Sequence, residues 1–125
     1  IGEARGEIEK CAVTCEYFAH HSERLLTDSI IPTEAKRTYV SYHPTGAVFG
    51  IMPWNFPFWQ VFRFVVPTVM AGNVALLKHA PNVCQVSLVI EEIFQQAGFP
   101  EGVFQSFIID VDQVERIIAH DIVQA

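Results

Sequence analysis

The first quarter of the chain shows apolar residues spaced three or four positions apart. They are Ile8, Cys11, Ala12, Cys15, Phe18, Ala19 and Leu25. Glu7, Glu9, Lys10 and Glu16 fall on the other face. This spacing predicts an amphipathic helix from about Glu3 to Thr27, with one stripe packed against a core.

The pattern then changes to alternation. Residues 37–43 (Arg-Thr-Tyr-Val-Ser-Tyr-His) are rich in aromatic and β-branched residues, which favours a strand. Pro44-Thr45-Gly46 is a turn signal before the apolar run 47–52. The segment therefore predicts a strand, a turn and a second strand.

From residue 58 onward, helical and strand patterns alternate. The first predicted helix runs from Phe58 to the stop at Ala71-Gly72-Asn73, and a buried strand, Val74–Leu77, follows it. A second helix of about Val83–Ala97, capped by Asn82 and closed by Gly98, precedes a strand at Val103–Ile109. A short helix capped by Asp110 or Asp112 then ends at Ala119, and a further strand starts at Ile122-Val123. This order predicts an α/β fold with an incomplete Rossmann-like, doubly wound parallel sheet and right-handed crossovers.

Composition narrows the function classes. Of 125 residues, 50% are hydrophobic, ten are Phe, and the mean hydropathy is +0.26. This apolar content exceeds what the core of so small a domain can bury, so we expect an oligomer or a piece of a larger protein. The net charge of −6 argues against a nucleic-acid surface. Three prolines in the uncharged run 38–62 argue against a membrane span.

The termini and cysteines add three expectations. Residues 1–5 lack both a signal-peptide pattern and an initiator Met, so the N-terminus is expected to be truncated or processed. The three cysteines lack metal-type spacing, so no metal site is expected. Reduced, cytoplasmic thiols are the default interpretation.

Residues 52–63 (Met-Pro-Trp-Asn-Phe-Pro-Phe-Trp-Gln-Val-Phe-Arg) carry the strongest chemical signal. Pro53 and Pro57 flank Trp54-Asn55-Phe56, which places Asn55 on a constrained turn. The turn enters a helix, so free backbone N–H groups beside the Asn55 amide are expected. That arrangement suits an anion or a developing oxyanion.

The helix that follows predicts a pocket face. Phe56, Trp59, Gln60 and Arg63 have i, i+3, i+4, i+7 spacing. Arg63 among apolar residues suggests a carboxylate anchor, although a guanidinium that reaches solvent or pairs with a glutamate is the alternative. The tryptophans are equally compatible with ordinary core packing.

Lys78 stands at the carboxyl end of a predicted strand, where open α/β sheets bind ligands. It predicts a hydrogen bond to a ribose hydroxyl or phosphate, and a solvated lysine is the alternative. His79 is interpreted as a loop histidine whose hydrogen bonds are satisfied and which has no catalytic role. Gly-x-Gly-x-x-Gly is absent, so a standard Rossmann phosphate turn is not predicted.

Three motifs together resemble the aldehyde dehydrogenase superfamily. They are Pro53-Trp54-Asn55-Phe56-Pro57, Ala71-Gly72-Asn73 and Leu77-Lys78, and the similarity extends over essentially all 125 residues. Residues 59–61 and 77–83 are similar to a bacterial subgroup of succinate-semialdehyde dehydrogenases. The resemblance implies a cysteine thiohemiacetal, hydride transfer to NAD or NADP, and thioester hydrolysis assisted by a glutamate.

The resemblance also implies roles for particular residues. Asn55 donates its amide to the thiohemiacetal oxyanion. Ile51, Met52, Pro53 and Trp54 line the cofactor channel, while Lys78, Ala80 and Pro81 lie along the adenosine ribose. Phe56, Trp59, Gln60 and Arg63 line the substrate side, with Arg63 similar to a carboxylate-binding arginine. Lys78-His79-Ala80-Pro81 departs from the commoner Lys-Pro-x-Glu, and without that glutamate NADP is not excluded.

The expected organisation is a partial NAD(P)-binding domain over residues 1–125. It comprises a helical segment 1–30, the start of a β-hairpin-type oligomerisation element at 36–46, and Rossmann-like βαβ units at 47–125. The family's nucleophilic cysteine and general-base glutamate are expected beyond this piece, which alone is expected to be inactive. Cys11, Cys15 and Cys84 receive no catalytic role. The first alternative function is a non-catalytic nucleotide-binding or oligomerisation module. The second alternative is an enzyme for apolar aldehydes.

Overall fold

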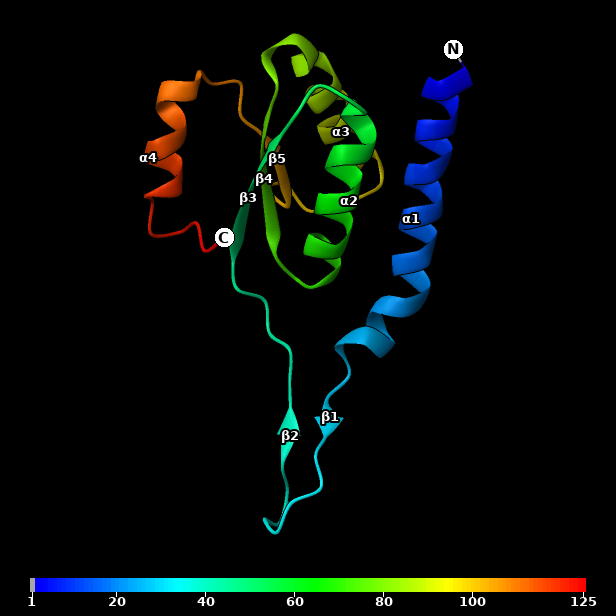
Figure 1. Ribbon diagram of the computed structural model, residues 1–125, viewed down its shortest axis with the longest axis vertical. Helices are drawn as coiled ribbons and strands as arrows, with labels where there is room; N and C mark the ends of the chain where they lie inside the picture. Colours follow the sequence, from blue (N-terminus) through cyan, green and yellow to red (C-terminus); the bar gives the residue numbers. More distant parts are fainter. Residues whose placement is uncertain (1) are drawn as a thin grey trace.

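A computed structural model describes residues 2–125. The first element is α1 (Gly2–Leu26), which confirms the predicted amphipathic helix. It lies alongside α2 (Pro57–Met70), and its buried Cys11 joins the apolar cluster formed by α2 and the sheet (Figure 1). Within the segment 1–30 predicted to be helical, the helix ends at Leu26 and Ser29–Ile30 form a short strand, while Ile1 lies outside the described residues.

The central sheet has three parallel strands in the order β3-β4-β5. They are β3 (Ala47–Met52), β4 (Val74–His79) and β5 (Phe104–Ser106). The middle strand β4 is buried along most of its length, as its unbroken apolar run predicts. The third strand is shorter than the predicted Val103–Ile109, because only two hydrogen bonds, Ala75 N–H to the Val103 carbonyl (2.9 Å) and Phe107 N–H to the Leu77 carbonyl (2.7 Å), extend the pairing beyond it.

The last residues of the chain run beside β3 on the side away from β4. Val123 forms a parallel bridge with Ala47, and the Phe49 N–H donates to the Ala125 carbonyl (2.7 Å). This supports the strand expected at Ile122-Val123 and gives a spatial order of β5, β4, β3, then 123–125. The order reverses at β3, so β3 borders the topological switch point of a doubly wound sheet.

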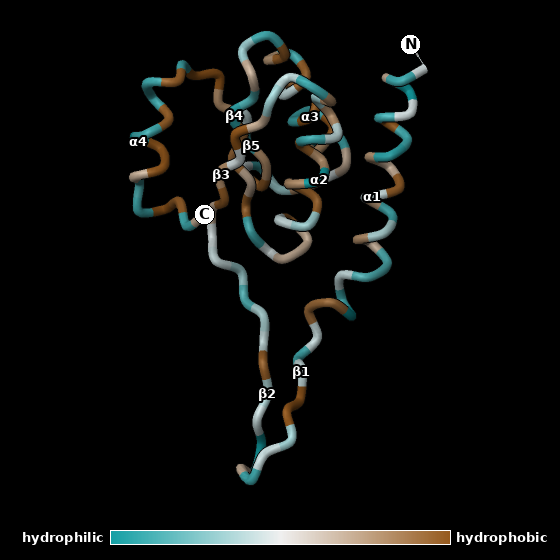
Figure 2. Tube along the Cα trace, in the orientation of Figure 1, coloured by the Kyte–Doolittle hydropathy of each residue, from teal (hydrophilic) through white to brown (hydrophobic). Residues whose placement is uncertain are grey.

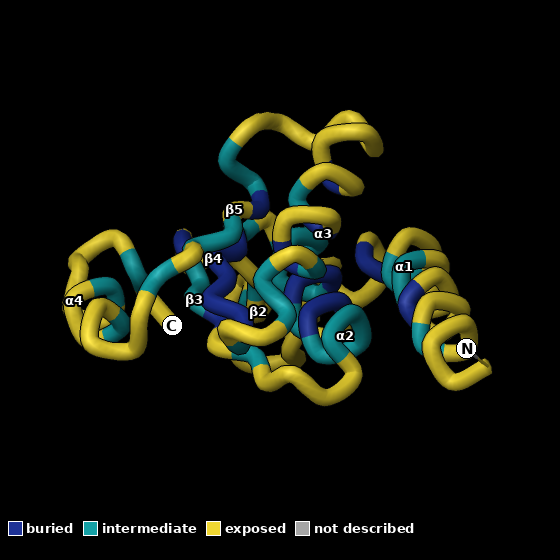
Figure 3. Tube along the Cα trace, turned by 90° about the horizontal axis from the view of Figure 1, so that it is seen from above, coloured by how far each residue is buried: buried dark blue, intermediate teal, exposed yellow. Residues whose placement is uncertain are grey.

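Helices cover both faces of this sheet. The crossover helices α2 and α3 (Cys84–Gln96) lie on one face, while α4 (Val114–Ile118) lies on the other (Figures 1 and 3). The short 3₁₀ turns η1 (Pro81–Val83) and η2 (Val111–Gln113) precede α3 and α4. Asp110 is the N-cap residue of η2, and its N–H donates to the Gln113 side chain (3.0 Å), which agrees with one of the two predicted caps.

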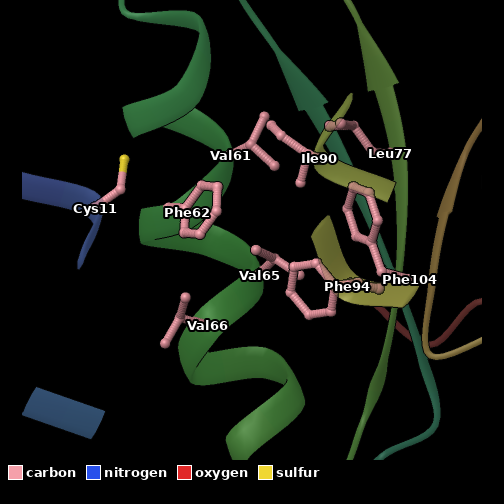
Figure 4. Packing of buried hydrophobic residues seen from close by; sticks show 10 residues of the cluster. Cys11, Val61, Phe62, Val65, Val66, Leu77, Ile90, Phe94 and Phe104 are labelled. Carbon is pink, nitrogen blue, oxygen red and sulfur yellow. The ribbon is translucent and has the colours of Figure 1, made fainter. Parts of the chain in front are cut away.

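The core lies between α2, α3 and the sheet. Its fully buried members are Val61, Val65, Ala75, Leu77 and Ile90, of which all but Ala75 are labelled in Figure 4. The helix and sheet approach closely at Gly50 in β3, because a Cβ there would lie 2.5–2.9 Å from three carbons of the Phe64 ring. Gly50 thus allows α2 to sit directly on β3.

Two local predictions are wrong. The strand predicted over residues 37–43 is much shorter than expected. Only β2 (Tyr39–Val40) is a strand there, and it pairs antiparallel with β1 (Ser29–Ile30) in an arm that projects from the body (Figure 1). Run 47–52 joins the buried parallel sheet, since its apolar side chains need cover on both faces.

The second wrong prediction concerns Asn82. It lies inside η1 rather than capping α3, whose N-cap residue is Val83 with no side-chain cap hydrogen bond. Pro81 starts the 3₁₀ turn one residue earlier, and the Val83 N–H donates to the Ala80 carbonyl (3.1 Å). Proline in the first helical position thus took precedence over the asparagine cap.

Candidate functional site

A four-residue turn joins the carboxyl end of β3 to α2. Its last residue, Phe56, has φ 53° and ψ 62°, which makes it the one non-glycine residue with positive φ among residues 2–125. Phe56 precedes a proline, which disfavours the right-handed α region. A left-handed aromatic residue is strained, and such strain persists only where the surroundings hold it. The predicted constrained turn is confirmed, with Asn55 exposed on it.

His79 lies close to both ends of this turn. Its ring is 4% exposed at the end of β4, with Nε2 2.9 Å from the Pro57 carbonyl and Nδ1 3.3 Å from the Met52 carbonyl. The Ala80 N–H donates to Nδ1 (3.0 Å). The neutral Nε2–H tautomer satisfies the Ala80 and Pro57 contacts together. His79 is therefore satisfied, as expected, but it is a buried strand residue whose Nε2–H links β4 to Pro57 on the α2 side of the turn.

The amino-terminal end of α2 differs from the expectation of free N–H groups. Oε1 of Glu7, from α1, accepts hydrogen bonds from the Phe58 N–H (2.7 Å) and the Trp59 N–H (2.8 Å). A carboxylate is the group that a helix N-terminus favours. The expected anion position is thus filled by the protein itself, and the Asn55 side chain remains exposed on the turn.

A cleft of about 530 Å³ adjoins this turn. Its lining residues are Glu3, Gly6, Glu7, Lys10, Asn55, Phe56, Trp59 and Gln60. Lys10 lies over the Trp59 ring, with Nζ 3.8 Å from the ring centroid. The structure therefore brings together Asn55 and three of the four predicted substrate-side residues. Arg63 is exposed on α2 and lies outside this lining.

The predicted cofactor side lies along the carboxyl ends of β3 and β4. Ile51 and Trp54 are exposed, at 52% and 63%, and Pro53 is also exposed, while Met52 is half-buried. Lys78 is only 5% exposed, so the alternative of a solvated lysine is wrong. Its ammonium donates to the His79 carbonyl (3.2 Å), which uses one of its three protons.

A cleft of about 240 Å³ continues from this edge past Pro81. It is lined by His79, Pro81, Cys84, Phe107, Ile108, Ile109, Asp110 and Gln113. Phe107, Ile108 and Ile109 give this cleft an apolar side suited to an adenine ring, and Lys78 precedes the lining residue His79 on β4. The partly buried Ala80 and the exposed Pro81 flank this edge.

Two of the three cysteines are poor candidates for a nucleophile. Cys11 is buried against α2, and burial followed by the negative charge of Glu7 raises the pKa of its thiol from 9.0 to about 11. Burial also raises the pKa of Cys15. Thiols held protonated at neutral pH are poor nucleophiles. Among residues 2–125, no group of three or more Cys, His, Asp or Glu side chains could hold a metal ion.

Sequence reasoning missed Glu7, Lys10 and His79 as site residues. Glu7 was assigned to the solvent face of its helix, yet it lies four residues before the buried Cys11 and therefore on the same face. A carboxylate on an apolar stripe was the available signal. For His79, the signal was its place directly after a buried apolar strand, where a polar ring must find backbone partners.

The order of the sheet, with the turn that carries Asn55 beside its switch point, is that of the doubly wound domains that bind dinucleotides. The sequence profile of the aldehyde dehydrogenase family matches residues 1–125. The chain belongs to the aldehyde dehydrogenase family.

Relatives are similar over nearly the whole chain. A probable NADP⁺ succinate-semialdehyde dehydrogenase of Synechocystis is 50% identical over 125 residues, covering 100% of this chain and 28% of the relative. An NADP⁺ succinate-semialdehyde dehydrogenase of Mycobacterium avium is 44% identical over 123 residues, covering 94% and 26%. The chain thus spans about a quarter of the length of these relatives.

Solved structures agree. The succinic semialdehyde dehydrogenase of Streptococcus pyogenes in complex with NADP⁺ superposes with a TM-score of 0.95 at 32% identity, covering 98% of this chain and 27% of the other. This confirms the predicted Rossmann-like fold. No helix within residues 2–125 is long and apolar enough to cross a membrane.

Proposed function

We propose that this chain forms part of an enzyme that oxidises succinate semialdehyde to the carboxylic acid, with NADP or NAD as hydride acceptor. The observation that carries the proposal is the cleft that gathers Asn55, Phe56, Trp59 and Gln60 at the switch point. Relatives named as NADP⁺ succinate-semialdehyde dehydrogenases support the substrate and favour NADP. Pro81, in place of a ribose-binding glutamate, is consistent with room for a 2′-phosphate.

In this proposal, Asn55 donates its side-chain N–H to the oxyanion of a thiohemiacetal. The family's cysteine nucleophile and general-base glutamate are contributed from outside these 125 residues, which are inactive alone. Ile51, Met52, Pro53 and Trp54 form one wall of the cofactor channel. Lys78, Ala80 and Pro81 lie along the ribose, where a bound cofactor supplies the hydride acceptor.

Two cations are candidates for the substrate carboxylate. Arg63 is the predicted anchor, and it is exposed and therefore accessible. Lys10 is the second candidate because it lines the cleft that contains Asn55. Its ammonium already interacts with Trp59, so we retain Arg63 as the proposed anchor.

The test measures KM for succinate semialdehyde and for butanal in the enzyme that contains this chain. Arg63→Ala should raise KM for succinate semialdehyde about 10–100-fold and change KM for butanal little, because a hydrogen-bonded charge pair is lost only with the acid. Lys10→Ala is the comparison variant, and Arg116→Ala, on the far face of the sheet, is the control. Equal KM effects on both aldehydes would remove the carboxylate role and favour an enzyme for apolar aldehydes.

The β1–β2 arm is proposed to bind another copy of the protein. Ile30, Tyr39, Val40 and Tyr42 are exposed by 43–77%, an apolar surface that copies could cover (Figure 2). Three free cysteines are consistent with a reducing, cytoplasmic location.

The rival function is a non-catalytic nucleotide-binding or oligomerisation module. It predicts NADP binding without turnover of any aldehyde by the protein that carries this chain. A steady-state assay with saturating NADP and succinate semialdehyde separates the two. Turnover supports the dehydrogenase, and cofactor binding without turnover supports the rival.

A further inference from the structure

Glu7 joins two segments that are about fifty residues apart in sequence. It comes from the first turns of α1, while its two hydrogen-bond donors are Phe58 and Trp59 at the start of α2. Both bonds are short and converge on one carboxylate oxygen, Oε1. Asn55 lies three residues before Phe58, in the same cleft as Glu7.

The hydrogen bonds of the first turn of α2 can be counted completely. Pro57 has no N–H, and the Gln60 N–H donates to the Phe56 carbonyl (2.9 Å). Phe56, the N-cap residue, makes no side-chain cap bond. The N–H groups of Phe58 and Trp59 are therefore the only ones of this turn that need an external acceptor, and Glu7 supplies both.

This bond network also surrounds the strained residue. The two residues after the left-handed Phe56 are both held, Pro57 by His79 on the sheet side and Phe58 by Glu7 on the α1 side. Strain of this kind relaxes when one restraint is removed. A relaxed Phe56 would move the adjacent Asn55 amide, because the two share a peptide bond.

We infer that Glu7 is a positioning residue for Asn55. Its carboxylate caps α2 and holds the turn in the geometry that aims the Asn55 amide. The same carboxylate closes the helix N-terminus to the substrate's own carboxylate. The inference deepens the proposed function and rests on it. The exclusion of the substrate carboxylate from the helix N-terminus follows from charge. An acidic aldehyde is attracted to an open helix N-terminus, and Glu7 occupies that position with a like charge.

The test compares Glu7→Ala, Glu7→Asp and Glu7→Gln in the enzyme that contains this chain. Glu9→Ala is the control, an exposed glutamate on the same helix. Glu7→Ala should lower kcat about 10–100-fold, the loss expected when a catalytic group is displaced by about 1 Å. Glu7→Asp should also lower kcat because its oxygen falls short of the two N–H groups. Glu7→Gln should stay within severalfold of wild type because its carbonyl can still accept both bonds.

Acetate provides the readout that a purely structural cap would not give. Glu7→Ala removes the equivalent of an acetate, so added acetate should restore kcat severalfold in this variant, whereas sodium chloride of equal ionic strength should not. Acetate should also raise the Tm of Glu7→Ala more than that of wild type or Glu9→Ala. Succinate should inhibit Glu7→Ala more strongly than wild type because the opened helix end accepts a carboxylate.

The outcomes test the positioning role of Glu7 separately from the proposed function. An unchanged kcat in Glu7→Ala, or a Tm restored by acetate without recovery of kcat, overturns the positioning role. If Glu7→Ala does not fold, equal kcat in Glu7→Asp, Glu7→Gln and wild type overturns it. A wild-type enzyme that turns over no aldehyde refutes the proposed function, and the acetate-dependent Tm then decides the capping of α2 by itself.

Discussion

The β3–β4–β5 body and the β1–β2 arm use similar residues in opposite ways. In the body, apolar strands are sealed by helices, and Leu77 and Ala75 are fully buried. In the arm, two strands of two residues each carry Ile30, Tyr39 and Val40 outward, with exposures of 77%, 46% and 43% (Figure 3). Similar hydrophobicity thus leads to a core in one region and a free surface in the other.

The difference follows from what each region packs against. Parallel strands require crossover helices, and those helices bring their own apolar faces to the sheet. The arm is a short antiparallel pair without a helix on either face, and a two-stranded hairpin is marginal by itself. Stability should therefore reside in the body, while the arm should contribute to association.

The largest expected effect comes from breaking the body at its centre. Leu77→Ala removes a fully buried side chain from the cluster formed with Val61, Val65 and Ile90. The free energy of unfolding should fall by about 2–5 kcal/mol, through lost burial and a residual cavity. Urea denaturation measures it, with the half-exposed Leu88→Ala as control. Equal losses in both variants would contradict the assigned core.

A smaller loss is expected where α2 meets β3. Gly50→Ala places a methyl group 2.5–2.9 Å from carbons of the Phe64 ring, so the ring or the helix must shift. Such overpacking should cost about 1–3 kcal/mol in free energy of unfolding. Gly6→Ala on α1 has open space and should be neutral or slightly stabilising. Thermal melts of the two variants that coincide would show that Phe64 does not pack on Gly50.

The smallest effect is expected in the arm. Ile30→Ser should change the free energy of unfolding by less than about 0.5 kcal/mol in dilute solution, because the side chain is already exposed. At higher protein concentration, size-exclusion chromatography should show weaker association than in wild type. A loss of more than 1 kcal/mol in dilute solution would mean that the arm is part of the core.

The body was largely predictable from sequence, and the reason is its periodicity. The helix at 3–27, the helix from residue 58 and the strand at 74–77 were each placed to within about two residues. Gly72 and Gly98 have φ of 86° and 83° after their helices, which matches the predicted stops. Long periodic segments bounded by glycine carry their structure locally.

The arm and the site contacts were less predictable because they depend on partners distant in sequence. The β-propensity of residues 37–43 could not reveal that Ser29-Ile30 would pair with them. Similarly, a free helix N-terminus beside Asn55 was a sound local prediction. It was wrong because Glu7, some fifty residues earlier, supplies the acceptor. Tertiary contacts of this kind leave only weak signals in local patterns.

The central claim is that the Asn55 amide stabilises an oxyanion formed during aldehyde oxidation. Its most direct test is kcat of Asn55→Ala in the enzyme that contains this chain, with saturating NADP and succinate semialdehyde and with Asn82→Ala, an exposed asparagine in η1, as control. Loss of one oxyanion donor should lower kcat roughly 10²–10³-fold and leave the control unchanged. An Asn55→Ala enzyme with wild-type kcat would contradict the account.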